Sequence, residues 1–197
     1  AVHESGHTAV AFYTPDADPL YKVTIIPRGQ SLGSTQMLPT NERHTLPEAH
    51  LRGQLSTLLA GRAAEKLLLG SVSSGADDDI RRATELARAM ISRWGMDPEL
   101  GPVDLRHSVE HPFLGQQIAQ PRSFADETAA RVDNAVMNLL HAAEKEALHV
   151  IKTHRDAVER LVARLEAEET LDLDAIQSCL DPESTVTPFV NDRRKGS

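Results

Sequence analysis

The chain has 197 residues, long enough for one hydrophobic core, and a net charge of −8 that argues against nucleic-acid binding as its main function. Its single cysteine excludes an internal disulfide, and its longest apolar runs are far shorter than the roughly 18 residues of a membrane-spanning helix. Aromatic residues make up only 4% of the chain, so we expect a mainly α fold with a core of aliphatic helix faces.

The chain begins with His3-Glu4-Ser5-Gly6-His7, a pattern of the form H-E-x-x-H. On a helix, residues four apart lie on the same face, so His3 and His7 can bind one metal ion while Glu4 projects beside it. Catalytic zinc has three protein ligands and lowers the pKa of water to roughly 7, so that a nearby carboxylate can take its proton. The pattern predicts a zinc site with Glu4 as general base, although such histidine pairs also occur by chance in unrelated helices.

The helix that carries this motif should extend to about Tyr13, because Pro15 ends it. Only two residues precede His3, so we expect the chain to be a piece of a longer protein. Two short strands should follow over residues 22–27 and 33–38, which are rich in strand-forming residues and flank a glycine-containing turn.

A long helix should begin at a capping box, with Thr45 as the N-cap and Glu48 three residues later, and end at Gly70. Its leucines recur at intervals of three and four, which predicts a core-facing helix, and Gly61 should let another helix approach closely. We interpret this helix as core scaffold, except that Glu65 is an alternative third metal ligand.

Three aspartates, residues 77–79, open the next helix, which should extend to Trp94 and stop at Gly95. The helix dipole alone would explain acidic residues in a first turn. Asp79, however, shares its helix face with apolar residues: Ala83, Leu86 and Met90. Because a carboxylate that faces the core needs a partner, we predict that Asp79 binds the same metal ion as the two histidines.

The remainder of the chain should be helical after a long connection. Residues 95–122 contain several prolines and glycines without a sustained period, which predicts a loop. A long amphipathic helix should follow from about Ser123, then a second around residues 157–165 and a short one over residues 172–180. Residues 181–197 mix proline, charge and glycine, so we expect a disordered tail.

These residues resemble the peptidase domain of the FtsH family, the membrane-anchored, ATP-dependent zinc metalloproteases with an AAA module. Besides the zinc motif, the resemblance rests on Lys22-Val23-Thr24-Ile25-Ile26-Pro27-Arg28-Gly29, Leu59-Ala60-Gly61-Arg62-Ala63-Ala64-Glu65, Ser74-Gly75-Ala76 with Asp79-Ile80, Ala83-Thr84-Glu85-Leu86-Ala87-Arg88-Ala89-Met90, and Trp94-Gly95-Met96 with Leu100-Gly101-Pro102. In the family, two histidines and a downstream aspartate bind zinc and the motif glutamate is the base. These roles correspond to His3, His7, Asp79 and Glu4.

The chain departs from the family pattern in places that leave these residues intact. The family usually has alanine where Ser5 and Thr8 stand. The chain also contains no G-x-x-x-x-G-K-[ST] phosphate loop and no spanning segment, so we expect the ATP-binding AAA module and the membrane anchor to lie outside it. The resemblance further implies a homo-hexamer at the cytoplasmic side of a membrane.

The leading hypothesis is a zinc metallopeptidase domain over residues 1–180, made of a catalytic core (1–94), the loop (95–122) and a C-terminal helical bundle (123–180). A two-stranded β element near the active site would receive substrate beside Gln36 or Met37. The domain would use one Zn²⁺ per chain, and the resemblance implies that it degrades unfolded or misassembled polypeptides.

An alternative from another functional class is a catalytically silent, zinc-containing assembly module. Intact Glu4 argues against it, because a purely structural zinc site has no use for a base and normally closes all four coordination positions.

Overall fold

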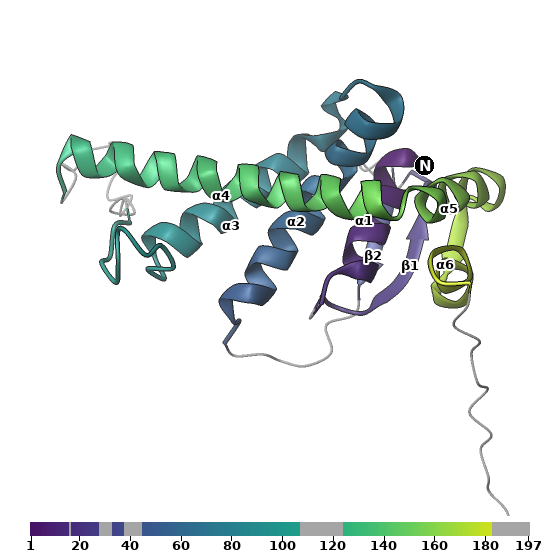
Figure 1. Cartoon of the computed structure of the whole chain (residues 1–197), viewed down its shortest axis with the longest axis horizontal. Coiled ribbons are helices and arrows are strands. Elements are labelled where there is room, and N and C mark those ends of the chain that lie inside the picture. Colours follow the sequence, from purple (N-terminus) through teal and green to yellow (C-terminus); the bar gives the residue numbers. More distant parts are fainter. Residues whose placement is uncertain (16, 28–32, 38–44, 107–123, 183–197) are drawn as a thin grey trace, which may run out of the picture.

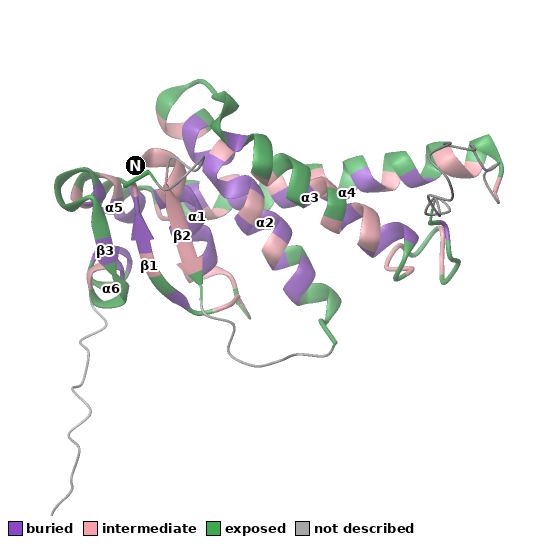
Figure 2. Ribbon diagram, turned by 180° about the vertical axis from the view of Figure 1, so that it is seen from behind, coloured by how far each residue is buried: buried purple, intermediate pink, exposed green. Residues whose placement is uncertain are grey.

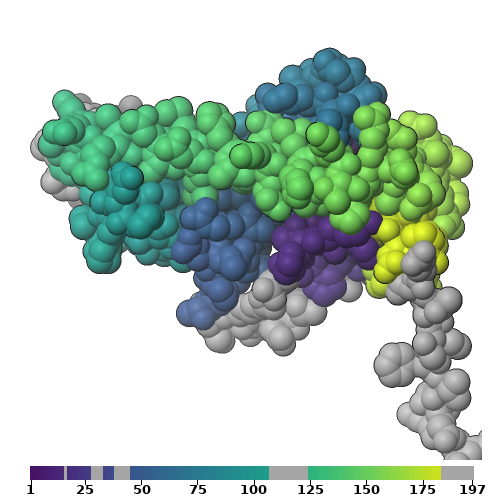
Figure 3. Space-filling view, viewed as in Figure 1, coloured from purple at the N-terminus to yellow at the C-terminus, as the bar shows by residue number. Residues whose placement is uncertain are grey.

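In the computed structural model, residues 1–15, 17–27, 33–37, 45–106 and 124–182 are described, and they are mainly helical (Figure 1). The α-helices are α1 (Val2–Tyr13), α2 (Glu48–Ala64), α3 (Asp77–Ser92), α4 (Asp126–Thr153), α5 (Arg155–Glu168) and α6 (Leu173–Leu180). The long helix α4 packs against α1, α2 and α3 and runs along most of the long axis of the molecule, as far as α5 (Figure 3). The predicted mainly α fold is confirmed.

A small antiparallel sheet lies beside α1, with strand order β2-β1-β3. Its strands are β1 (Leu20–Thr24), β2 (Ser34–Met37) and β3 (Thr170–Asp172). The predicted β element had only the first two strands, because a three-residue strand directly before a helix is too short to show a period. Among the described residues, no strand pairs with the outer side of β2, so β2 is an edge.

The buried apolar residues form two clusters. Figure 2 shows buried residues alternating with more exposed ones along the helices, for example on α2 and α4. One cluster joins α1, the sheet and the C-terminal helices, with Val10, Val23 and Leu161 fully buried. The other fills the space between α2, α3 and α4, around Leu55 and Met90. Helices from the end of the chain therefore complete the core that holds α1, the helix of the H-E-x-x-H motif.

Helix α2 begins later than predicted. Its N-cap is Pro47, in an extended conformation and without a side-chain cap hydrogen bond. Proline disfavours helical backbone in the residue before it, so the helix cannot include Leu46, and the predicted capping box at Thr45 is wrong. The C-terminal end is closer to the prediction: α2 continues into a π-helical turn (Glu65–Leu69) that stops at Gly70, whose φ is +70°.

The other predicted boundaries are close to the observed ones. Helix α3 ends at Ser92, two residues before the predicted end, and Gly95 has a φ of +60°. Residues 95–106 contain no helix or strand, as predicted for the loop. The rest of that loop and most of the predicted tail lie outside the described residues. No described helix combines the length and apolar character needed to cross a lipid bilayer.

Candidate active site

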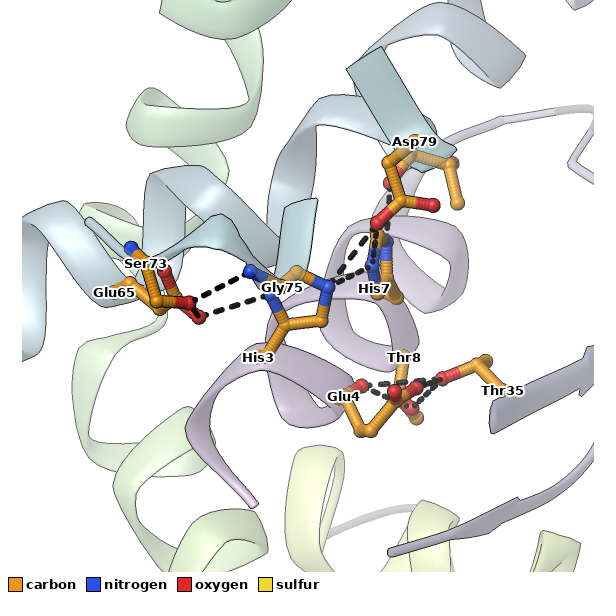
Figure 4. A network of polar contacts seen from close by, with 10 residues as sticks. His3, Glu4, His7, Thr8, Thr35, Glu65, Ser73, Gly75 and Asp79 are labelled. Atoms are coloured by element: carbon orange, nitrogen blue, oxygen red, sulfur yellow. Dashed lines mark hydrogen bonds and ion pairs between the residues drawn. The ribbon is translucent and has the colours of Figure 1, made fainter. Parts of the chain in front are cut away.

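Side chains from α1 and α3 converge on one point (Figure 4). The Nε2 atoms of His3 and His7 lie 3.0 Å apart, and Oδ2 of Asp79 lies 3.1 Å from each. Zinc bonds to nitrogen and oxygen of roughly 2.0–2.1 Å place tetrahedral ligands about 3.3 Å from one another. The triangle formed by the three atoms therefore fits one face of a zinc coordination shell.

The other ring nitrogen of each histidine has a partner that fixes the ring. Nδ1 of His7 donates to the carbonyl oxygen of Thr57 at 2.7 Å, and Nδ1 of His3 donates to Oε1 of Glu65 at 3.1 Å. Each neutral ring therefore carries its proton on Nδ1 and presents a lone pair on Nε2. Two lone pairs and a carboxylate oxygen require positive charge between them, and a metal cation satisfies all three at once.

When no metal is bound, a proton on Nε2 of either ring can be shared with Asp79 instead. Burial alone would raise the pKa of Asp79, but hydrogen bonds with His3 and His7 hold it far below its usual range. Burial likewise opposes the hydrogen bonds from Ser73 and His3 that lower the pKa of Glu65. For His3, burial lowers the pKa, but the hydrogen bond and charge of Asp79 raise it above its ordinary value. The carboxylates are thus held in the charged form, the form in which Asp79 binds a metal.

Glu4, the predicted base, lies between the metal ligands and strand β2 (Figure 4). Its Oε2 is 3.2 Å from Oγ1 of Thr35, and its backbone oxygen accepts a 2.8 Å hydrogen bond from the hydroxyl of Thr8. A Cβ on Gly33 would come within 2.9 Å of the Glu4 side chain, so this glycine leaves room for the carboxylate. Nothing in the local sequence pattern marks Thr35 or Gly33 as part of a site, so neither was predicted.

Glu65 does not join the three converging atoms. Its carboxylate accepts hydrogen bonds from the backbone N–H and the hydroxyl of Ser73 at 2.9 Å each, and from Nδ1 of His3. Glu65 was the alternative third ligand, because a helix-borne glutamate is the third ligand in other zinc peptidases. In the structure it lies behind His3, where it orients the ring that faces Asp79.

A close helix crossing brings α1 onto α2. A Cβ on Gly61 would lie 2.5 Å from Nε2 of His3 and 2.6 Å from Nε2 of His7, and one on Gly6 would lie 2.5 Å from the backbone oxygen of Ala60. Such distances are shorter than any real contact, so both positions require glycine. The close approach predicted at Gly61 is therefore observed, and it is made by the two histidines themselves.

Gln36 and Met37 lie on the edge strand β2, on the same strand as Thr35. Gln36 is half-buried, and Met37 is 37% exposed. The structure thus places both residues on the strand that contacts Glu4, although they are not among the residues that converge on the metal position.

Comparison with known proteins gives a consistent result. A model of peptidase family M41 matches residues 1–179. The chain is 61% identical over 180 residues to the ATP-dependent zinc metalloprotease FtsH of Hahella chejuensis, an alignment that covers 91% of this chain and 29% of that protein. Identity is 42% over 173 residues to the ATP-dependent zinc metalloprotease FtsH of Nitrosococcus oceani, covering 88% of this chain and 27% of the relative. The chain thus spans less than a third of the length of these relatives.

Proposed function

Because the chain belongs to peptidase family M41, we propose that it is the proteolytic domain of a longer, ATP-dependent zinc metalloendopeptidase. The resemblance to FtsH peptidase domains inferred from the motifs is confirmed by the family match and by the relatives' names. We assign residues 1–180 to this domain, with residues 1–94 as its catalytic core.

The observation that carries this proposal is the convergence of His3, His7 and Asp79 within 3.0–3.1 Å of one another. These residues would hold one zinc ion. When bound, zinc acts as a Lewis acid that polarises a carbonyl group and lowers the pKa of water to about 7. Glu4, next to His3 on α1, accepts the proton of the attacking water and donates it to the leaving amine.

We propose that the substrate binds as an extended peptide along β2. The outer side of this strand has no strand partner within the described residues, so its main-chain groups can pair with a substrate backbone. Main-chain pairing tolerates many sequences, which suits the degradation of unfolded or misassembled proteins. Gln36 and Met37 would then contact substrate side chains, and Thr35 would connect this strand to Glu4.

The rest of the full-length protein is inferred from the family. The relatives are longer than this chain and are named as ATP-dependent, which supports an AAA module that binds ATP outside these residues. By the same resemblance, we propose that the protein assembles as a homo-hexamer and is anchored at the cytoplasmic side of a membrane. The alternative of a silent assembly module would leave Glu4 without a function.

Substitution Glu4→Gln tests the proposal. It removes the base but keeps the shape of the side chain and all three zinc-binding groups. We expect zinc content near that of the parent, and hydrolysis of an unfolded substrate such as casein lower by about a hundredfold or more. Turnover within a few fold of the parent would contradict the role of Glu4, and a zinc-loaded parent that leaves casein intact would favour the assembly module.

A further inference from the structure

Glu4, Thr8 and Thr35 form a hydroxyl network on the side of α1 that faces β2 (Figure 4). Oγ1 of Thr35 lies 3.2 Å from Oε2 of Glu4, 3.2 Å from the backbone oxygen of Glu4 and 3.1 Å from Oγ1 of Thr8. Thr8 is fully buried, whereas Glu4 and Thr35 are half-buried. One strand hydroxyl therefore meets the predicted base at both its side chain and its main chain.

Counting protons shows which of these contacts are hydrogen bonds. Each threonine hydroxyl has one proton to donate. The hydroxyl of Thr8 donates to the backbone oxygen of Glu4, its shortest contact at 2.8 Å. The proton of Thr35 then goes to the strongest remaining acceptor, which is the charged carboxylate of Glu4. Because Thr8 has no second proton to donate to Thr35, the hydroxyl of Thr35 is oriented by its own hydrogen bond to the Glu4 carboxylate.

We propose that Thr35 is a positioning residue that holds the Glu4 carboxylate in the orientation needed to act as a base. The inference rests on the proposed function. With Oε2 bonded to Thr35, the carboxylate is fixed about its last torsion, and its other oxygen is available to a water molecule.

The position of Thr35 on the edge strand adds a second consequence. Its main chain pairs with Val23 of β1, so the strand is anchored on one side and can receive a substrate on the other. The strand that would bind the substrate backbone thus also holds the base through a single side chain. Substrate position and base orientation therefore share one rigid element.

The test is Thr35→Val, which keeps the β-branched shape and removes the hydroxyl, in the full-length zinc-loaded protein. We expect kcat on casein to fall about tenfold or more, because one hydrogen bond to a charged group is lost. KM should stay within about twofold of the parent, and the zinc content should be unchanged. Thr35→Ser, which restores the hydroxyl, should recover most of the lost kcat. In crystal structures, the Glu4 carboxylate should leave its parental position in Thr35→Val and keep it in Thr35→Ser.

Thr24→Val is the matched control. Thr24 lies on the neighbouring strand, and its hydroxyl bonds to the Glu169 oxygen, to Thr170 and to the backbone N–H of Ile26, and not to Glu4. It reports what the loss of a sheet hydroxyl does to folding, and its kcat should stay near the parental value. Thr35→Val with kcat within twofold of the parent, a rise in KM alone, failed rescue by serine, or an unmoved Glu4 carboxylate would each overturn the inference. If Glu4→Gln cleaves casein as fast as the parent, the proposed function fails instead, and the crystal structures still decide whether Thr35 orients Glu4.

Discussion

At the scale of single residues, two acids contact opposite nitrogens of the His3 ring. Asp79 meets Nε2 beside His7, whereas Glu65 meets Nδ1 from behind. This difference separates a metal ligand from a group that orients a ligand, because only an atom on the Nε2 side can share a metal with both rings. Both are negative carboxylates, Glu65 buried and Asp79 half-buried, so the ring nitrogen that each one contacts distinguishes them where their chemistry does not.

Metal analysis of two variants checks this assignment. Asp79→Asn should lose most of its bound zinc. Glu65→Gln should keep zinc but bind it about 10- to 100-fold more weakly, which is the usual effect of mutating a group that hydrogen-bonds to a metal ligand. The amide oxygen of a glutamine can still accept from His3 and the Ser73 hydroxyl, but its NH2 group cannot accept from the Ser73 backbone N–H as Oε2 does, so the side chain is held less firmly behind His3. Loss of zinc from the Glu65 variant alone would reverse the two roles.

Ser5 is a buried residue whose hydroxyl has no hydrogen-bond partner within the described part of the chain. A buried, unsatisfied hydroxyl typically costs about 1–3 kcal/mol. Ser5→Ala should therefore raise the free energy of unfolding by about 1 kcal/mol, measured by urea denaturation. Ser56→Ala is the comparison, because Ser56 is also buried but donates to the Arg52 oxygen, and it should gain nothing. An equal gain in both variants would contradict the explanation.

At the scale of helices and strands, the zinc site depends on how closely α1 crosses α2. Gly61→Ala places a methyl group about where His3 and His7 now lie, so the rings must move apart. We expect zinc affinity to fall about tenfold or more, measured by competition with a chelator.

Gly53→Ala is the control for this substitution on the same helix. Among the described residues, its added Cβ would meet only the methyl group of Thr14, the end of a side chain that can rotate away. Zinc affinity should then remain near that of the parent. Similar losses of affinity in both variants would mean that helix propensity, and not the crossing of α1 over α2, controls the site.

Most elements could be predicted because each carries its own periodic signal. Helix α3 shows the phase that turns Asp79 inward, and the spacing of His3 and His7 requires only a helix. Strand β3 could not be predicted, since its three residues are identified only by pairing with β1. The capping box failed for a related reason: Thr45 has the right residue type, but Pro47 moves the start of the helix past it.

The partners of the site residues were harder to find than the residues themselves. Glu65 contacts His3 across 62 positions, and Thr35 contacts Glu4 across 31. Such contacts depend on how α1 packs against α2 and the sheet, which no local pattern encodes. The sequence therefore predicts the chemistry of the metal position, but the groups that orient its side chains become visible only in the folded chain.

At the scale of the whole molecule, a peptidase that reads extended chains needs its substrate unfolded. A folded domain resists unfolding by about 5–15 kcal/mol, and this chain has no phosphate-loop motif with which to use ATP. The isolated chain should therefore cleave a permanently unfolded protein and leave the same protein intact when it is tightly folded. Fragment analysis of both forms, with and without ATP, measures this.

Two outcomes would contradict that expectation. Equal rates on the folded and the unfolded substrate would show that no external unfolding activity is needed. Acceleration by ATP in the isolated chain would reveal a nucleotide site that the sequence motif does not identify. With the full-length protein, by contrast, ATP should allow cleavage of the folded substrate.

The metal position also joins two distant parts of the chain, because His3 and Asp79 are 76 residues apart. A bound ion would act there as a reversible cross-link that closes a long loop between α1 and α3. Since zinc would bind the folded chain and not the separated ligands, a thousandfold excess over its Kd would add about 4 kcal/mol to stability. Copies of the domain without metal would then unfold sooner than loaded ones, so the lifetime of the enzyme would follow the zinc supply of the cell.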